Sequence, residues 1–264
     1  MSLVDIGKSF SHTLREKLVP QRFVFHHVPK CGGTSVGRAL RKRYILSQAT
    51  VVPESSFRAF EAFTGREDRQ QMLIDVLDLR EQMMLYHMFE DVRGISLHVR
   101  FSNVAHDRFR DLYKFITVLR EPVSRFISHY HWSYGKPHAH ARIEEDFETF
   151  LSTERARRMG ATYVEYFCGL PKDESITSDV AIAAAIGNLK RLDVVGNLAD
   201  LGPFERDIQS ALGVRIRIGR ENVRKKRPGS QSELDNPALR ARIEEICAPD
   251  IAVWNAIFPQ QVVK

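Results

Sequence analysis

The sequence has few cysteines and no long apolar run. Its three cysteines, Cys31, Cys168 and Cys247, are too few and too widely spaced for a disulfide framework or a zinc site. We therefore expect reduced thiols and no bound metal. The apolar runs are much shorter than the roughly 20 residues that a membrane-spanning helix needs, and residues 1–20 hold no stretch typical of a signal peptide. These absences predict a cytoplasmic protein without a transmembrane segment.

The sequence also lacks internal repeats and low-complexity linkers. Its 264 residues, 43% hydrophobic and 27% charged, have an ordinary globular composition. We expect a single domain over residues 1–264. The net charge of +6 favours anionic ligands, such as a nucleotide, a nucleic acid, an acidic polysaccharide or a membrane surface, without choosing among them.

Short β-type runs alternate with helix-like stretches along the chain. The runs are RFVFHH (22–27), ATVV (49–52), GISLHV (94–99), KFITVL (114–119), LDVVG (192–196) and VRIRI (214–218). The helix-like stretches include residues 34–45, 121–132, 178–191, 200–212 and 237–248. This alternation predicts an α/β fold of three layers, with helices flanking a mainly parallel central sheet. We also predict a helical insertion at about 54–92 and a loop-rich segment at about 133–145.

A glycine-rich turn, HHVPKCGGTS, follows the first predicted strand. Ligands of open parallel sheets bind beyond the carboxyl ends of the strands, where this turn lies. Glycines allow close backbone approach, and the amide groups of Gly33, Thr34 and Ser35 would point out of a helix start, where anions bind. Lys30 precedes both glycines, so this is not a Walker A loop. The turn indicates either a phosphate site or a plain strand–helix connection.

A second turn of this kind follows the fourth strand, in the sequence LREPVSRFISHYHW. Pro122 suits the first position of a helix, and Ser124 and Ser128 would share one helix face. Arg120 can bind two oxygens of a phosphate with its planar guanidinium. Taken alone, Arg120 is better interpreted as a structural salt-bridge partner of Glu121 or of another carboxylate. Two anion-binding turns at neighbouring strand ends indicate a ligand with phosphates at both ends.

The two turns together resemble those of the PAPS-dependent carbohydrate sulfotransferases, typified by heparan sulfate and uronyl 2-O-sulfotransferases, where PAPS is 3′-phosphoadenosine 5′-phosphosulfate. The resemblance runs from about residue 22 to about residue 256 and includes FCGLP (167–171) and NVRKKRP (222–228). It implies a P-loop-like fold in which the loop residues wrap the 5′-phosphosulfate, Arg120 and Ser128 hold the 3′-phosphate, and Arg220 or Arg224 reaches the nucleotide. The loop residues are Lys30, Cys31, Gly32, Gly33, Thr34 and Ser35.

Cys31 and Glu121 stand where the family often has threonine and aspartate. Neither change removes a phosphate donor. A helix start beside Lys30 would lower the pKa of Cys31 and make the thiol reactive. We interpret Cys31 instead as a small packing residue.

Sulfuryl transfer to a hydroxyl group needs a general base, and a histidine of near-neutral pKa suits this task. His98, in GISLHVRF, matches the position of a family histidine, and we predict that it is the base. His87 and Glu90 are the alternatives. Lys30 would stabilise the charge that develops on the leaving phosphate, and no metal is required.

Two other functions stay open from the sequence. One is a nucleotide-dependent phosphotransferase, although the sequence lacks a Walker A loop and a clear arrangement of Mg²⁺-binding carboxylates. The other is a non-catalytic binder of nucleic acid or polyanions that uses the cations of residues 220–227. We favour the sulfotransferase and expect no nucleic-acid partner. Its acceptor would bear a hydroxyl group, and the basic charge suits an anionic glycan; the sequence does not define the oligomeric state.

Overall fold

Five β-strands form a parallel sheet in the computed structural model, which describes residues 21–66, 68, 72–136, 142–170, 174–219 and 236–259. Their order across the sheet is β2-β3-β1-β4-β5, and every neighbouring pair is parallel. The strands are β1 (Arg22–His26), β2 (Gln48–Thr50), β3 (Gly94–Leu97), β4 (Tyr113–Leu119) and β5 (Val194–Asn197). The α/β fold with a parallel central sheet, predicted from the alternating pattern, is confirmed.

The centre of the sheet is apolar on both faces. In β1, Phe23, Val24 and Phe25 are fully buried, and in β4 so are Phe115 and Ile116. Continuous apolar strands of this kind need cover on both sides, because alternate side chains point to opposite faces. The helices provide this cover.

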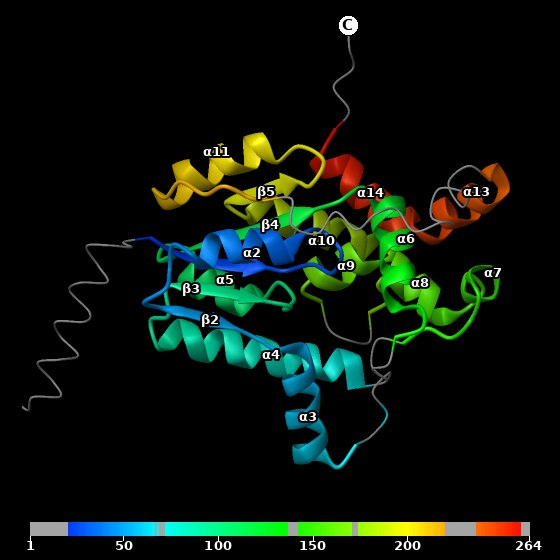
Figure 1. The fold of residues 1–264 in the computed structure, drawn as a ribbon, viewed down its shortest axis with the longest axis horizontal. Helices are drawn as coiled ribbons and strands as arrows, with labels where there is room; N and C mark the ends of the chain where they lie inside the picture. The colour runs from blue at the N-terminus through cyan, green and yellow to red at the C-terminus, as the bar shows by residue number, and fades with distance from the viewer. Residues whose placement is uncertain are drawn as a thin grey trace, which may run out of the picture.

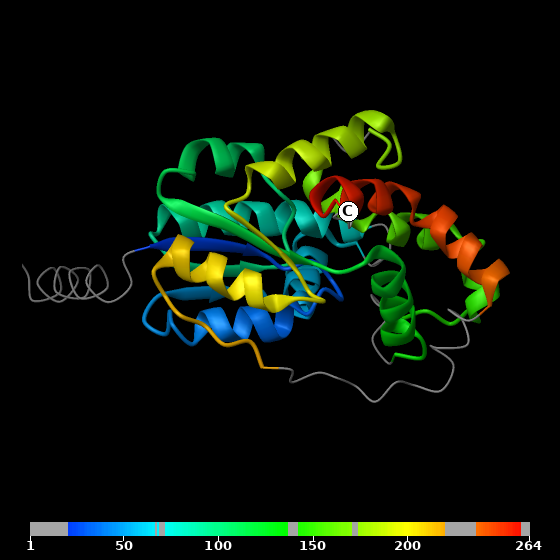
Figure 2. The same cartoon turned by 90° about the horizontal axis from the view of Figure 1, so that it is seen from above.

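Helices lie on both faces of the sheet and at one of its edges (Figures 1 and 2). On one face lie α2 (Gly33–Arg41) and α11 (Leu201–Leu212), and on the other lie α5 (Asn103–Phe109) and α10 (Asp179–Arg191). Two helices, α3 (Pro53–Thr64) and α4 (Met72–Phe89), lie beyond β2 in the segment where we predicted a helical insertion. These elements make the three-layer arrangement expected of a P-loop-like fold.

The remaining helices gather at the end of the molecule where the strands finish (Figure 1). They are α6 (Pro122–Ser133), α7 (Phe147–Phe150), α8 (Glu154–Gly160), α9 (Thr162–Phe167), α13 (Pro237–Ile246) and α14 (Ala248–Ile257). A second apolar cluster, which includes Phe126, Tyr130 and Phe150, packs α6 against this group. The cluster holds α6 beside the carboxyl ends of the strands.

The strand order creates a switch point between β1 and β4. The chain leaves β1 through α2 toward β2 at one edge, whereas it continues from β4 to β5 at the other edge. Loops that diverge in this way open a crevice at the carboxyl ends of the two strands, where ligands of parallel α/β proteins bind. The two turns singled out in the sequence both begin at this crevice.

The prediction of a sixth strand at VRIRI (214–218) is wrong. Residues 214–218 form no strand pairing. The Arg215 carbonyl accepts from Arg43 Nε at 2.9 Å, and the Ile218 amide donates to Glu205 Oε1 at 2.7 Å. Ile216 is buried while Arg215 and Arg217 are exposed. The alternation of apolar and charged residues therefore arises because this extended segment buries one of its sides. It does not show that the segment belongs to the sheet.

Candidate active site

A cleft of about 1030 Å³ opens at the carboxyl ends of the strands. Four strand ends contribute to it: Lys30 follows β1, His98 follows β3, Arg120 follows β4 and Leu198 follows β5. Lys30, Gly32, Gly33, Thr34, Ser35, His98, Arg120 and Ser128 all line this cleft. The structure thus brings together most of the residues that the sequence indicated.

The first loop has a backbone that few residues adopt without cost. Lys30 has φ 65° and Gly32 has φ 73°, both in the left-handed region. A non-glycine residue in this region is uncommon and marks a strained position, often a functional one. At Gly33 a Cβ atom would lie 2.0 Å from Cδ2 of His27, so no side chain fits there. The glycine pair therefore allows the loop to turn tightly against His27.

The amide groups at the start of α2 face the cleft. Within the described residues, neither Gly33 nor Thr34 donates its amide hydrogen to a protein acceptor. The Ser35 amide, which we expected to be free, donates to the Gly32 carbonyl at 3.1 Å, so Ser35 offers its hydroxyl group alone. Unpaired amides at a helix start bind anions.

One side of α6 faces the same space. Ser124, Ser128 and Trp132, four residues apart, all line the cleft, as residues on one helix face should. The Lys30 ammonium lies over the Trp132 ring, 5.3 Å from its centroid. This cation–π contact connects the first loop to α6, and no sequence pattern predicted it.

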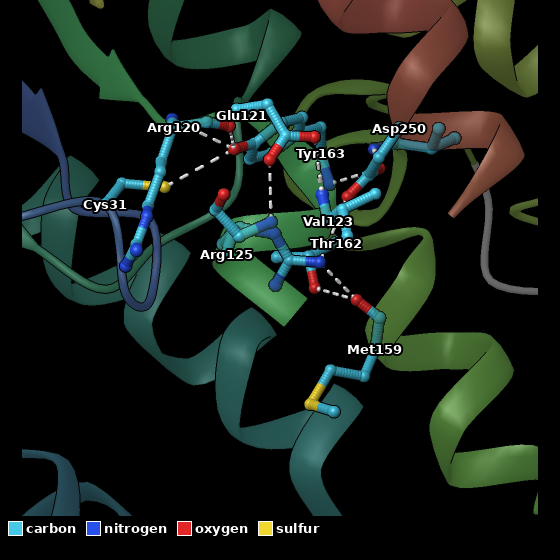
Figure 3. A network of polar contacts seen from close by, with 11 residues as sticks. Cys31, Arg120, Glu121, Val123, Arg125, Met159, Thr162, Tyr163 and Asp250 are labelled. Atoms are coloured by element: carbon cyan, nitrogen blue, oxygen red, sulfur yellow. Dashed lines mark hydrogen bonds and ion pairs between the residues drawn. The ribbon is translucent and has the colours of Figure 1, made fainter. Parts of the chain in front are cut away.

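Arg120 begins the second loop, and its side chain extends beside Cys31 (Figure 3). Glu121 does not form the salt bridge that we considered as an alternative. Its carboxylate accepts the amide hydrogens of Val123 and Ser124 at 2.9 and 2.7 Å and so caps α6. Among the described residues, no carboxylate lies within ion-pair distance of Arg120. The guanidinium therefore stays available to an anion in the cleft.

His98 stands in the cleft with its ring stacked on that of His27, the centroids 3.9 Å apart. Burial, and then the nearby Arg80 guanidinium, lower the pKa of His98 to about 4. Burial likewise lowers the pKa of His27 well below its usual value, helped by the proximity of His98. Both rings are neutral at pH 7, so His98 can accept a proton.

The alternative bases lie elsewhere. His87 and Glu90 are at the end of α4, just before β3 begins, and neither lines the cleft. The end of the sheet where β3 begins is opposite the end where the ligand crevice opens. Neither residue can take an acceptor proton in this cleft, and His98 is the remaining candidate of the three.

Cys31 differs from the other loop residues. Its thiol is fully buried, contacts the Tyr163 hydroxyl at 3.6 Å and does not line the cleft. Burial raises the pKa of Cys31 to about 11, so the thiol is protonated and unreactive. The structure supports its interpretation as a packing residue and excludes its side chain from the proposed nucleotide contacts. Arg220 and Arg224 lie outside the described residues.

Several cleft residues were missed from the sequence. Arg80 of α4, Arg155 and Arg158 of α8, Glu165 of α9 and His129 of α6 all line the cleft. Arg158 forms an ion pair with Glu165, whereas Arg80 donates to Ser56 Oγ and to the His98 carbonyl. No local pattern marks the residues of α4, α8 and α9, because packing between distant helices brings them to the cleft, whereas His129 lies in the second motif beside Ser128.

Two further features concern metal and membrane. Among the described residues, no group of three or more His, Cys, Asp or Glu side chains is placed to hold a metal ion. Over the same part of the chain, no helix combines the length and apolar character needed to cross a membrane.

Comparison with known families gives a clear match. A search of curated proteins returns no significant relative. The sequence model of the sulfotransferase family matches residues 20–180, which is more than half of the chain and includes both loops and His98. The chain therefore belongs to the sulfotransferase family, and this membership identifies it as a transferase of sulfuryl groups.

Proposed function

We propose that the protein transfers the sulfuryl group of PAPS to a hydroxyl group of a carbohydrate or a related acceptor. The observation that carries this proposal is the shared cleft, in which two cationic loops and a neutral histidine face the same space. A nucleotide with phosphates at both ends suits two separate anion sites. Transfer from it requires the third element, a base beside the acceptor hydroxyl.

The first loop would hold the 5′-phosphosulfate. Its donors are the Gly33 and Thr34 amides, the Thr34 and Ser35 hydroxyl groups, and the Lys30 ammonium. The second loop would hold the 3′-phosphate through the Arg120 guanidinium and the Ser128 hydroxyl. Arginine suits this role because it binds two phosphate oxygens at once.

The reaction would be an in-line displacement at sulfur. The acceptor oxygen forms a bond to sulfur, the bond between sulfur and the bridging phosphate oxygen breaks, and the acceptor proton passes to the free nitrogen lone pair of the His98 ring. Lys30 and the loop amides stabilise the charge that appears on the leaving 5′-phosphate. Positioning and charge stabilisation then supply most of the catalysis, as in phosphoryl transfer.

Arg80 supports an anionic acceptor. Its side chain is buried on the cleft wall, and within the described residues its hydrogen bonds go only to the neutral oxygens of Ser56 and His98. A buried cation without a counter-charge is costly, and an acceptor carboxylate or sulfate near His98 would compensate it. A uronic-acid-containing glycan offers both this carboxylate and the hydroxyl group.

The direct test offers labelled PAPS with a panel of uronic-acid-containing glycans, neutral glycans and simple phenols, and maps the sulfated position. We expect label on a hydroxyl group of an anionic glycan, and loss of most of that transfer in Lys30→Ala. Transfer to phenols alone would contradict the carbohydrate assignment. No transfer to any class would contradict the proposed reaction.

The role of Arg120 has its own test. Arg120→Ala should weaken binding of adenosine 3′,5′-bisphosphate by at least about tenfold. Binding of adenosine 5′-monophosphate should weaken much less, because the substitution removes only the partner of the 3′-phosphate. Arg110→Ala, which removes an exposed arginine outside the cleft, is the matched control. Equal losses for both nucleotides would show that Arg120 has another task.

A further inference from the structure

Tyr163 of α9 lies behind the cleft wall and touches both loops. Its side chain is fully buried and does not line the cleft. The hydroxyl group accepts the Arg120 amide hydrogen at 3.0 Å, donates to the Arg120 carbonyl and contacts the Cys31 sulfur at 3.6 Å (Figure 3). One oxygen atom thus joins the loop after β1 to the loop after β4.

These contacts use all the hydrogen-bonding capacity of the hydroxyl group. A tyrosine hydroxyl has one proton to donate and two acceptor positions. Its proton goes to the Arg120 carbonyl, so the Cys31 thiol and the Arg120 amide are the donors. Burial raises the pKa of both Tyr163 and Cys31, so both groups keep their protons at neutral pH.

Tyr163 is itself held in place from the opposite side. Its amide donates to Asp250 Oδ1 at 2.8 Å, and Asp250 of α14 forms a buried ion pair with Arg125 at 3.3 Å. The Arg125 guanidinium also lies over the Tyr163 ring, 5.3 Å from the centroid. The position of the hydroxyl group is therefore fixed by α6 and α14 as well as by α9.

The sheet alone does not fix the two loops relative to each other. The pairing of β1 with β4 ends at His26 and Thr117. Cys31 and Arg120 lie beyond these last paired residues, where the chains diverge toward different helices. The Tyr163 hydroxyl spans the gap that the strand pairing leaves open.

We propose that Tyr163 is a positioning residue that sets the spacing between the two anion sites. This inference rests on the proposed function, in which one nucleotide places a phosphate on each loop. A ligand that reaches both loops depends on their spacing, whereas a ligand that reaches only one loop does not. Tyr163 therefore contributes to the affinity for a bisphosphate without touching it.

The test is the Tyr163→Phe variant, titrated with adenosine 3′,5′-bisphosphate, adenosine 5′-monophosphate and adenosine 3′-monophosphate. We expect bisphosphate binding to weaken about tenfold, because the partly buried Arg120 amide and carbonyl lose their partner and the loop shifts. Both monophosphates should bind within about twofold of wild type. The selective loss separates positioning from a general loss of stability, which would affect all three ligands alike.

Tyr113→Phe is the matched control. Tyr113 is buried at the opposite end of β4, and its hydroxyl donates to the Val92 carbonyl at 2.9 Å. It undergoes the same chemical change far from the loops and should leave all three affinities unchanged. Cys31→Ala removes only the thiol contact. It should lower the affinity for the bisphosphate less, by about threefold, and leave the affinities for the monophosphates unchanged. It tests the same inference should Tyr163→Phe fold poorly.

The outcomes separate this inference from the function on which it rests. A wild-type protein that binds the bisphosphate no more tightly than the monophosphates would contradict the proposed function. Tight, bisphosphate-selective binding in the wild type, together with equal losses or no loss in Tyr163→Phe and Cys31→Ala, would overturn the positioning role alone.

Discussion

The protonation state of His98 is the main chemical consequence of its surroundings. Burial and the Arg80 guanidinium both disfavour the charged ring, and they lower its pKa to about 4. The neutral ring can accept a proton at pH 7. Phosphate and sulfate groups bound nearby would raise this pKa, because negative charge favours the protonated form. Donor binding would then make His98 a stronger base.

Removing the His98 ring should separate catalysis from binding. We predict that His98→Ala lowers the rate of sulfuryl transfer at least about 100-fold, the range of a lost general base, while binding of adenosine 3′,5′-bisphosphate changes little. Rates come from labelled PAPS and affinities from titration. His87→Ala, outside the cleft, is the control and should retain wild-type rates. Full activity in His98→Ala would exclude His98 as the base.

The pH profile should report on Arg80. The base must be unprotonated, so kcat/KM falls as pH drops through the pKa of His98 in the free enzyme. In the wild type this acid limb should lie near pH 4. Arg80→Met removes a cation that lowers this pKa, so we predict that the limb moves to higher pH. The limb should stay below 6.5, because burial, the larger cause, persists.

Arg155→Met provides the comparison for this profile, since Arg155 lines the cleft but is not among the groups that shift the pKa of His98. Its acid limb should coincide with that of the wild type, whatever happens to the rate. An Arg80→Met profile with an unmoved limb would indicate that another group titrates.

At the scale of elements, the strand–loop–helix units were predictable and their internal geometry was not. The apolar runs of β1 and β4, the Gly32–Gly33 pair and Pro122 locate the two loops, because each feature acts through neighbouring residues. The contact of Lys30 with Trp132 depends on a helix about 100 residues later in the chain. Residues 214–218 show that a local pattern can also mislead. They alternate like a strand, but they pair with no strand of the sheet.

Gly32 should be irreplaceable for reasons of both backbone and space. A Cβ at this left-handed position would lie 2.5 Å from Leu198 Cδ1, a side-chain end that also lines the cleft. We predict that Gly32→Ala lowers the free energy of unfolding by about 1–2 kcal/mol, the cost of a left-handed alanine. It should also weaken bisphosphate binding severalfold, because the loop must shift. Denaturant titration and nucleotide titration measure the two effects.

Gly213 is a control glycine that shares the left-handed backbone of Gly32 but has open space where a Cβ would lie. It ends α11 with φ 68°, and nothing lies within 4 Å of its missing Cβ. Gly213→Ala should therefore lose similar stability and keep wild-type nucleotide affinity. A Gly32→Ala protein that binds the bisphosphate normally would show that the loop tolerates displacement.

At the scale of the whole molecule, the cleft combines parts that are far apart in the sequence. Lys30 and Arg120 could be predicted because each follows a recognisable strand, and parallel strands end at a common edge, whereas His98 was indicated by its match to a family position. Arg80, Arg155 and Arg158 could not be predicted, because helix packing alone brings them there. The alternative bases His87 and Glu90 do not line the cleft. His87 lies in the last turn of α4 and Glu90 just after it, whereas Arg80 lies in the middle of this helix.

The C-terminal helix α14 stabilises this assembly through Asp250. The carboxylate is fully buried, pairs with Arg125 of α6 and accepts the amide hydrogens of Tyr163 and Val164. We predict that Asp250→Ala lowers the free energy of unfolding by about 3–5 kcal/mol, because it leaves the Arg125 charge buried without its partner. Chemical denaturation checks this value.

Asp107→Ala is the corresponding control at the surface. Asp107 pairs with Arg191 but is largely exposed, and loss of an exposed ion pair should cost less than about 1 kcal/mol. Similar losses in the two variants would contradict the structural role assigned to Asp250.

The central claim is that the two loops hold one nucleotide that carries phosphates at its 3′ and 5′ ends. Calorimetric titration of the wild-type protein with adenosine 3′,5′-bisphosphate and with ATP tests it most directly. We predict that the bisphosphate binds at least about tenfold more tightly than ATP, because only the bisphosphate places a phosphate on each loop. Equal affinities, or a preference for ATP, would contradict the account.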